Sequence, residues 1–249
     1  MVGDALKWWE KQPAGKPVFL FLHFYDTHYN YLPPAPYNTL FDRAPRRVRG
    51  EIRYKNYFYF KRRRPTKRQF KHQLAQYDES IRYVDDQIKL IAEEARRSGR
   101  KLRWVITSDH GEEFGERGSW GHAHTLYAEQ LRIPLIFSGE GIPKGEHKNG
   151  WVGSHDIAPT IGKWAGIFPQ LQSEGIDLNP QMAGKSPLPD RIFLAETSRF
   201  KTNRLSLLFG KYRLEWNLKR NKIDLYDPIA DPEEKDNLAV NQKEKVERL

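Results

Sequence analysis

The chain contains no cysteine among its 249 residues. This absence excludes disulfide bonds, thiolate metal ligands and a cysteine nucleophile within these residues. Long apolar runs are also missing, because no stretch approaches the roughly 20 residues that a membrane-spanning helix needs. The first residues lack the basic start and the apolar stretch of a secretion signal. The sequence therefore predicts neither a membrane segment nor a signal peptide in the chain as given.

Acidic residues are in the minority, and the excess positive charge is local. Lys and Arg number 42 against 32 Asp and Glu, which gives a net charge of +10. From Arg43 to Lys71, 13 basic residues face one acid, Glu51, so this window sums to +12 and the rest of the chain to −2. Aromatic residues are interleaved with the cations, a composition that can hold an anionic ligand or stack on single strands. A solvated insertion is an equally good interpretation, and both stay open here.

Apolar runs of strand length and periodic helices alternate over the first two thirds of the chain. Apolar residues three and four apart predict a long helix over 69–97. A second helix is predicted over 154–165, with Pro159 in its first turns and Gly166 after its end. The runs without polar alternation, typical of strands covered on both faces, are 17–25, 102–107 and 133–137. This order predicts a three-layer α/β/α sandwich with a mainly parallel sheet.

The pattern changes after residue 167. Loops come first, followed by short strands separated by turn residues. These predicted strands are 191–197, 205–209, 212–216 and 223–225. We expect residues 1–167 to form one α/β domain with a basic insertion at about 41–72, and residues 168–249 to form a small C-terminal subdomain with an antiparallel sheet.

Three histidine-bearing segments adjoin ends of the predicted strands. They carry His28, then Asp109 with His110, then His122 with His124. Ligands of open α/β sheets bind beyond the carboxyl ends of strands, and a carboxylate beside an imidazole can bind a divalent cation. Taken alone, the segment with Asp109 and His110 is more typical of a turn cap, and His28 is more typical of a surface histidine. Together they favour metal-assisted hydrolysis or an anion site, with only one of the alternating His122 and His124 facing it.

Six blocks of the sequence, in order along the chain, resemble the sulfatases of the alkaline phosphatase superfamily. The blocks are 19–28, 77–85, 108–112, 121–136, 156–160 and 224–239. Any one block is a weak signal, whereas six in order over nearly the whole chain are a specific one. The resemblance implies a sulfatase, a sulfuric ester hydrolase acting on an anionic sulfate ester such as a sulfated glycan, and not a nucleic-acid ligand.

The resemblance also implies roles for single residues. Asp109 and His110 match two ligands of a divalent metal, usually calcium. His28 matches a residue that contacts the sulfate. His122 falls near the residue that binds sulfate and assists the leaving oxygen, and His124 competes with it for that position. By the habit of the family, the location would be extracytoplasmic, either periplasmic or secreted.

A sulfatase of this family needs further parts that the sequence does not contain. These are an earlier pair of metal-binding aspartates and a Cys or Ser, in a C/S-x-P-x-R setting, that is converted to formylglycine, the nucleophile. The chain has no cysteine and no Ser-x-Pro-x-Arg. We therefore expect a fragment that lacks the nucleophile and half of the metal site, that is inactive alone, and whose formylglycine would lie in an upstream segment.

Two alternatives remain on the sequence alone. One keeps the fold and changes the chemistry to phosphoryl transfer, as in the phosphatases and phosphoethanolamine transferases of the same superfamily. The other is a non-catalytic fragment that binds polyanions through the window from Arg43 to Lys71. The sequence identifies neither the substrate nor the oligomeric state.

Overall fold

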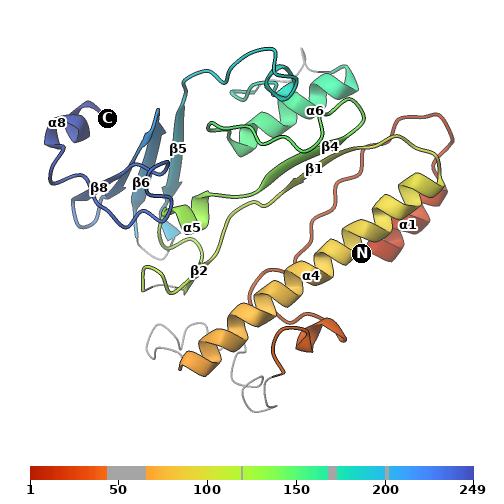
Figure 1. The fold of residues 1–249 in the computed structure, drawn as a ribbon, viewed down its shortest axis with the longest axis horizontal. Helices are drawn as coiled ribbons and strands as arrows, with labels where there is room; N and C mark the ends of the chain where they lie inside the picture. The colour runs from red at the N-terminus through yellow and green to blue at the C-terminus, as the bar shows by residue number, and fades with distance from the viewer. Residues whose placement is uncertain (44–65, 119, 168–172, 200–201) are drawn as a thin grey trace. The chain divides into compact units, whose positions relative to one another are not determined.

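The computed structural model describes residues 1–43, 66–118, 120–167, 173–199 and 202–249 (Figure 1). Most of the basic insertion expected at about 41–72 therefore lies outside the described residues. Contacts divide the chain into two compact units, one of Met1–Leu102 with Gly118–Gly121 and one of Arg103–Arg117 with His122–Leu249. The domain boundary expected after residue 167 stays a prediction, and each unit is described by itself.

The first unit is built on one long helix. Its elements are α1 (Val2–Glu10), the 3-10 helix η1 (Tyr37–Thr39), α4 (Lys67–Arg97) and β3 (Trp120–Gly121). The helix predicted over 69–97 is confirmed as α4. Thr66 starts it with a capping box, in which the Thr66 side chain accepts from the Gln69 backbone N–H and the Gln69 side chain accepts from the Thr66 backbone N–H. No helix among the described residues is both long and apolar enough to cross a bilayer.

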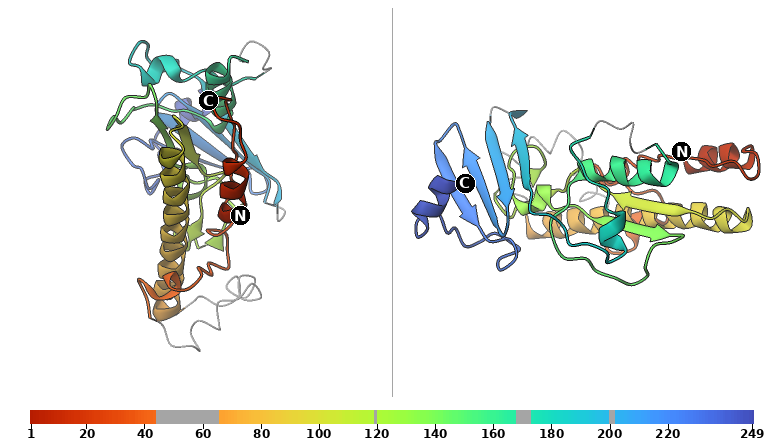
Figure 2. Two further views of the ribbon diagram at one scale, coloured as in Figure 1. Left: turned by 90° about the vertical axis from the view of Figure 1, so that its right-hand side faces the viewer. Right: turned by 90° about the horizontal axis from the view of Figure 1, so that it is seen from above.

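Helix α1 lies along the C-terminal end of α4 (Figures 1 and 2). The Trp9 indole N–H donates to the Ser98 hydroxyl at 3.1 Å. The Arg100 guanidinium lies 5.6 Å from the centre of the Trp9 ring and donates to the carbonyls of Gln12, Pro13 and Lys16. The loop after α1 is thus tied to the end of α4 by one arginine.

The strand predicted over 17–25 is wrong for the described chain. These residues form no strand, and the side chains of Phe19, Phe21 and Tyr25 are 69%, 75% and 65% exposed. An apolar run predicts burial of both faces, but burial requires neighbouring strands and covering layers. The described residues provide no ladder partner for this segment.

In the second unit, β1 (Arg103–Thr107) pairs with β4 (Leu135–Gly139). The pairing is antiparallel, so the mainly parallel sheet expected from the sequence is a wrong prediction for the described residues. An apolar run predicts that a strand is buried but does not predict whether it pairs in parallel or antiparallel. A parallel return needs a crossover, usually helical, and the connection between these strands holds only the short elements β2 (Glu113–Phe114), β3 and α5 (Ala128–Leu131).

A helical segment covers this strand pair. It consists of the 3-10 helix η2 (Ser154–Asp156) and α6 (Ile157–Ala165), followed by α7 (Asn179–Met182). Gly166 ends α6 with a left-handed φ of 74°, as its position in the sequence predicts. The Trp164 ring of α6 meets Phe137 of β4 edge to face, with 6.0 Å between ring centres. The fold is thus mixed α/β.

A four-stranded antiparallel sheet completes the second unit, as the sequence predicts (Figure 2). Its strands, in spatial order, are β5 (Ile192–Thr197), β6 (Arg204–Phe209), β7 (Tyr212–Asn217) and β8 (Lys222–Tyr226). A short helix, α8 (Lys243–Arg248), follows them, and Lys245 lies 3.8 Å from the centre of the Tyr212 ring. Arg213 and Glu234 form an ion pair buried against the sheet, with side chains 5% and 1% exposed.

Candidate active site

Asp109 and His110 follow directly after β1, on a turn that holds their side chains toward solvent. The Asp109 carboxylate accepts from the His110 backbone N–H at 3.0 Å, and the Ser108 hydroxyl donates to the His110 carbonyl at 2.6 Å. The Asp109 and His110 side chains are 69% and 39% exposed, with 3.7 Å between Asp109 Oδ2 and His110 Nε2. The turn therefore presents two potential metal ligands side by side.

The hydrogen bond of the His110 ring indicates which nitrogen can bind a metal. His110 Nδ1 lies 2.8 Å from the Gly111 carbonyl oxygen, which can only accept, so Nδ1 carries the proton. The lone pair is then on Nε2, the nitrogen nearest Asp109. A histidine ligand held through its other nitrogen is the usual arrangement in metal sites.

The donor set therefore fits a divalent cation in type but not in number. Calcium takes six to eight oxygen ligands, and most metal sites use at least three side chains. Among the described residues, no group of three or more His, Cys, Asp or Glu side chains is placed to hold an ion. Asp109 and His110 could supply only part of a metal site.

His122 lies against His110. Their ring centres are 4.1 Å apart, with 36° between the ring planes. His122 Nδ1 lies 3.1 Å from Glu112 Oε1, and the two side chains are 12% and 6% exposed. A carboxylate at this distance fixes the orientation of an imidazole.

Glu112 is a site residue that the sequence did not single out. It belongs to the same block as Asp109 and His110, yet nothing in the spacing predicts that it meets a histidine ten positions later.

His124 lies in a different environment from His122. It is 4% exposed and sits in a stretch with the buried Thr125 and Leu126. Ala123, between the two histidines, has a left-handed φ of 65°, which costs a residue with a side chain about 1–2 kcal/mol. Its backbone N–H donates to Gln130 Oε1 at 2.7 Å. The structure thus places His122, and not His124, beside His110.

A buried carboxylate lies behind the turn. Glu113 is 0% exposed, and its Oε1 accepts from Gln130 Nε2 at 2.6 Å and from the Thr125 hydroxyl. Burial raises the pKa of the Glu113 carboxyl above its usual range, and the hydrogen bonds from Thr125 and Gln130 offset only part of this effect.

The turn also packs closely on α5. The Gly111 N–H donates to the Gln130 carbonyl at 2.8 Å. A Cβ added at Gly111 would lie 2.0 Å from the Glu129 carbonyl oxygen, so the approach requires glycine. The segment that carries Asp109 and His110 is therefore held from behind by backbone contacts.

His28 belongs to the first unit, whereas Asp109, His110, His122 and His124 belong to the second. Within its unit, the His28 ring stacks on Tyr25, with 4.4 Å between ring centres, and its Nδ1 lies 2.8 Å from the Tyr29 carbonyl oxygen. Its role as a sulfate contact stays a prediction.

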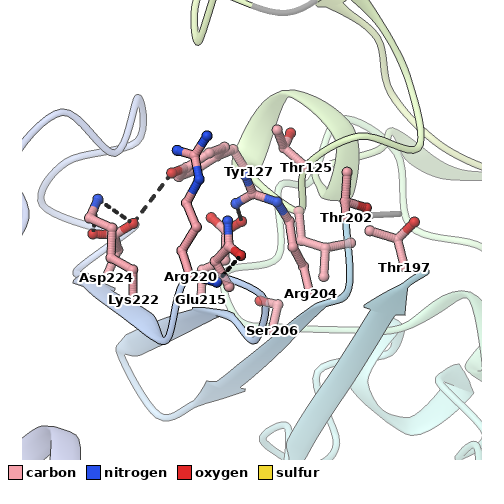
Figure 3. A network of polar contacts seen from close by, with 12 residues as sticks. Thr125, Tyr127, Thr197, Thr202, Arg204, Ser206, Glu215, Arg220, Lys222 and Asp224 are labelled. Carbon is pink, nitrogen blue, oxygen red and sulfur yellow. Dashed lines mark hydrogen bonds and ion pairs between the residues drawn. The ribbon is translucent and has the colours of Figure 1, made fainter. Parts of the chain in front are cut away.

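A second polar cluster lies on the C-terminal sheet (Figure 3). The Tyr127 hydroxyl donates to Asp224 at 3.4 Å, and Lys222 Nζ lies 2.8 Å from the same carboxylate. Arg204 forms an ion pair with Glu215, whose side chain is fully buried. No role for these residues follows from the sequence, because Tyr127 precedes α5 while the others lie on β6, β7 and β8, far from it along the chain.

Comparison with known proteins identifies the family. Residues 1–167 match the model of the Sulfatase family. The low-salt glycan biosynthesis sulfotransferase Agl7 of Haloferax volcanii is 44% identical over 82 residues, 30% of this chain and 19% of that protein. The Delta 4,5-hexuronate-2-O-sulfatase of Bacteroides thetaiotaomicron is 24% identical over 184 residues, 70% of this chain and 38% of that protein.

The fold is also similar to solved structures. The phosphonate monoester hydrolase of Silicibacter pomeroyi superposes with a TM-score of 0.74 at 21% identity, covering 99% of this chain and 57% of that chain. The chain thus spans little more than half of that structure, and a smaller share of the two curated relatives. The family match covers 1–167, well over half of the sequence, so the chain belongs to the sulfatase family of the alkaline phosphatase superfamily.

Proposed function

We propose that the protein is a sulfuric ester hydrolase that cleaves a sulfate ester with the help of a divalent metal. One observation carries this proposal: the rings of His110 and His122 lie 4.1 Å apart beside Asp109, each ring held through its Nδ1. The proposed metal ligands thus adjoin the imidazole that we propose as the general acid. Membership of the sulfatase family supports the reaction type.

In this proposal Asp109 and His110 Nε2 hold part of the metal site, with calcium as the expected ion. The metal, when bound, supplies positive charge to the oxygens of the sulfate group. His122 binds the sulfate and gives a proton to the leaving oxygen as the ester bond breaks. Glu112 orients the His122 ring.

We place the nucleophile outside these 249 residues. A formylglycine forms from Cys, or from Ser in a C/S-x-P-x-R setting, and the sequence has neither. We further propose that the complete protein forms the three-layer α/β/α sandwich and acts outside the cytoplasm. A sulfated glycan is the proposed substrate, supported by the hexuronate sulfatase among the relatives.

The test is release of sulfate from an aryl sulfate by the complete polypeptide encoded by the gene. Replacing His122 with Ala should lower kcat by about two to four orders of magnitude, the usual loss with a general acid. His147→Ala, at an exposed histidine on a loop, is the matched control and should leave kcat unchanged. Full activity of His122→Ala would refute the role of His122, and faster cleavage of an aryl phosphate would favour phosphoryl transfer.

A second candidate is transfer of the sulfuryl group to a glycan hydroxyl in place of water. The 44% identity over 82 residues with a glycan sulfotransferase favours it. The two reactions differ in the acceptor of the sulfuryl group, which is water in hydrolysis and a glycan hydroxyl in transfer. With a labelled sulfate donor and an acceptor glycan, hydrolysis gives free labelled sulfate, whereas transfer gives a labelled glycan.

A further inference from the structure

The second polar cluster begins at the candidate active site. The Thr197 hydroxyl, at the end of β5, donates to the Ala123 carbonyl at 3.2 Å. Ala123 is the residue between His122 and His124. The end of the C-terminal sheet therefore adjoins the turn on which His122 sits.

From Thr197, one row of polar residues crosses the whole sheet. Thr197 lies opposite Arg204, Arg204 opposite Asn217, and Asn217 opposite Lys222. Residues directly opposite in antiparallel strands point to the same face of the sheet. The row therefore presents hydroxyl, guanidinium, amide and ammonium groups in sequence, starting from the contact with Ala123.

Buried carboxylates hold the cations of this row. The Arg204 side chain, 16% exposed, pairs with Glu215, and the Lys222 side chain, 61% exposed, pairs with Asp224. Both carboxylates occupy the next row on the same face, since they lie two residues along their strands. In each pair the carboxylate is the more deeply buried partner.

Arg220 adds a third cation from the turn between β7 and β8. Its side chain is exposed and, among the described residues, its guanidinium makes no hydrogen bond or ion pair. In Figure 3 it extends to the same side of the cluster as the Tyr127 hydroxyl. An arginine held near other cations, without an acid of its own, is suited to bind an oxyanion.

Tyr127 lies beside Arg204, and its hydroxyl donates to Asp224 at 3.4 Å. Burial raises the pKa of its hydroxyl, and the carboxylates of Glu215 and Asp224 raise it further. The phenol therefore keeps its proton throughout the physiological pH range.

We propose that Arg204, Arg220 and Lys222 form a subsite for an anionic group of the substrate outside the reacting ester. The ligand is a carboxylate or a second sulfate on a sugar of an acidic glycan. This inference rests on the proposed function, because it names the part of the substrate that the same site would hold. Two of the cations are already oriented by buried acids, which lowers the ordering cost of binding.

Binding of a sulfated, uronate-containing disaccharide tests the subsite. The complete polypeptide is used with His122→Ala, so that the probe is not consumed, and calorimetric titration gives Kd. Arg220→Gln should raise Kd about tenfold, the loss expected for one charge-assisted contact. Lys222→Gln should do the same, because Asp224 keeps its hydrogen bond from Asn237 Nδ2 at 2.6 Å.

Lys243→Gln is the matched control, since it removes one exposed positive charge from the same unit, at the start of α8. It should leave Kd unchanged, and the basic window from Arg43 to Lys71 is present in every variant. Equal Kd values for Arg220→Gln and Lys243→Gln, or no binding of the probe before these substitutions, would overturn the subsite.

Turnover separates this inference from the proposed function. With His122 present, Arg220→Gln should raise KM for the sulfated disaccharide and leave kcat and KM for an uncharged aryl sulfate unchanged. Absence of all sulfate release would refute the hydrolase, while a Kd difference would still support the subsite. Sulfate release without a Kd difference would support the hydrolase and refute the subsite.

Discussion

Glu112 illustrates how one carboxylate can act through a neighbour. It contacts His122 at 3.1 Å and is only 6% exposed, so it can fix the ring without touching the substrate. Partners of this kind typically contribute a factor of about 10 to 100 to activity.

Replacing Glu112 with Gln should therefore lower kcat about 10- to 100-fold, while KM changes little, because the amide orients the imidazole less firmly than the carboxylate does. The kinetics of aryl sulfate cleavage by the complete polypeptide measure this split. Glu112→Asp should restore part of kcat, and Glu146→Gln, at an exposed acid, should have no effect. A proportional loss of folded protein with unchanged KM and kcat per folded molecule would show a purely structural role.

Asp156 is a buried carboxylate held by backbone and side-chain donors. It accepts hydrogen bonds from the Gly153 and Ile176 backbone N–H groups, both at 2.9 Å, and from two nitrogens of Arg191 at 2.8 and 2.6 Å. Burial alone would raise the pKa of Asp156, but the hydrogen bonds from Arg191, Gly153 and Ile176 outweigh it and hold the pKa below its usual range.

Asp156→Asn should lower the free energy of unfolding by about 3 kcal/mol near pH 7, because it leaves Arg191 without its counter-charge. A carboxyl with a lowered folded pKa stabilises the fold above its unfolded pKa, and this contribution is lost as pH falls through the folded pKa. The difference should therefore shrink in acid. Urea denaturation at neutral and acidic pH measures it, with Asp190→Asn, at an exposed neighbour, as control.

The pKa of Glu113 is shifted in the opposite direction from that of Asp156. Its pKa is raised by burial, so its contribution to stability is present at low pH and lost as pH rises through the folded pKa. Its Oε2 has no hydrogen-bond partner among the described residues. Glu113→Gln keeps the Oε1 acceptor and removes the charge, and should raise the unfolding free energy by about 1 kcal/mol above neutral pH. A variant that is less stable than the parent near pH 8 would contradict this.

At the scale of elements, α4 owes its start to a local device. The capping box joins Thr66 and Gln69 through reciprocal side-chain to backbone hydrogen bonds at 3.2 and 2.9 Å. Each half protects a backbone donor that the first helical turn would otherwise leave unpaired.

Thr66→Ala should cost about 1 kcal/mol of stability, the usual value for loss of an N-cap. Gln69→Ala should cost less, and the double variant should lose less than the sum, because both act through one motif. Thermal unfolding of the parent, the two single variants and the double variant gives the double-mutant cycle. Strictly additive losses would mean that the two hydrogen bonds act independently.

Elements with local signals could be predicted from the sequence, and long-range relations could not. Helix α4 and strands β5 to β8 lie close to their predicted bounds, because helical periodicity and turn residues are encoded within each segment. The antiparallel pairing of β1 with β4 could not be predicted, since direction depends on the path of the connection. The strand prediction over 17–25 was wrong because an apolar pattern indicates a buried strand only where neighbouring strands and covering layers bury it.

The candidate site follows the same division. Asp109 and His110 were found because a polar turn after an apolar strand is a local signal, and the placement of His122 follows from the chain's return beside that turn. The contact of Glu112 with His122 and the row from Thr197 to Lys222 depend on the pairing of distant segments. Such contacts leave no trace in the spacing of residues along the chain.

At the scale of the whole molecule, the proposed metal site has fewer candidate ligands than a calcium ion needs. Asp109 and His110 are the two candidate ligands, and the described residues offer no larger cluster. This chain by itself should bind calcium more weakly than about 1 mM, the lower end of protein affinities. Calorimetric titration tests it, and tight stoichiometric binding would contradict it. In the complete polypeptide, removal of calcium by a chelator should abolish sulfate release, and Asp109→Asn should raise the calcium concentration needed for half activity.

The close packing of Gly111 on α5 limits which codons the gene can carry at this position. A side chain at this position would collide with the backbone of Glu129, and backbone atoms cannot move aside as a flexible side chain can. In a population of genes carrying random codons at this position, selection for the folded protein should retain the four glycine codons alone. Alanine, the smallest alternative, would be removed along with the largest, so the site tolerates silent change at the third base and nothing else.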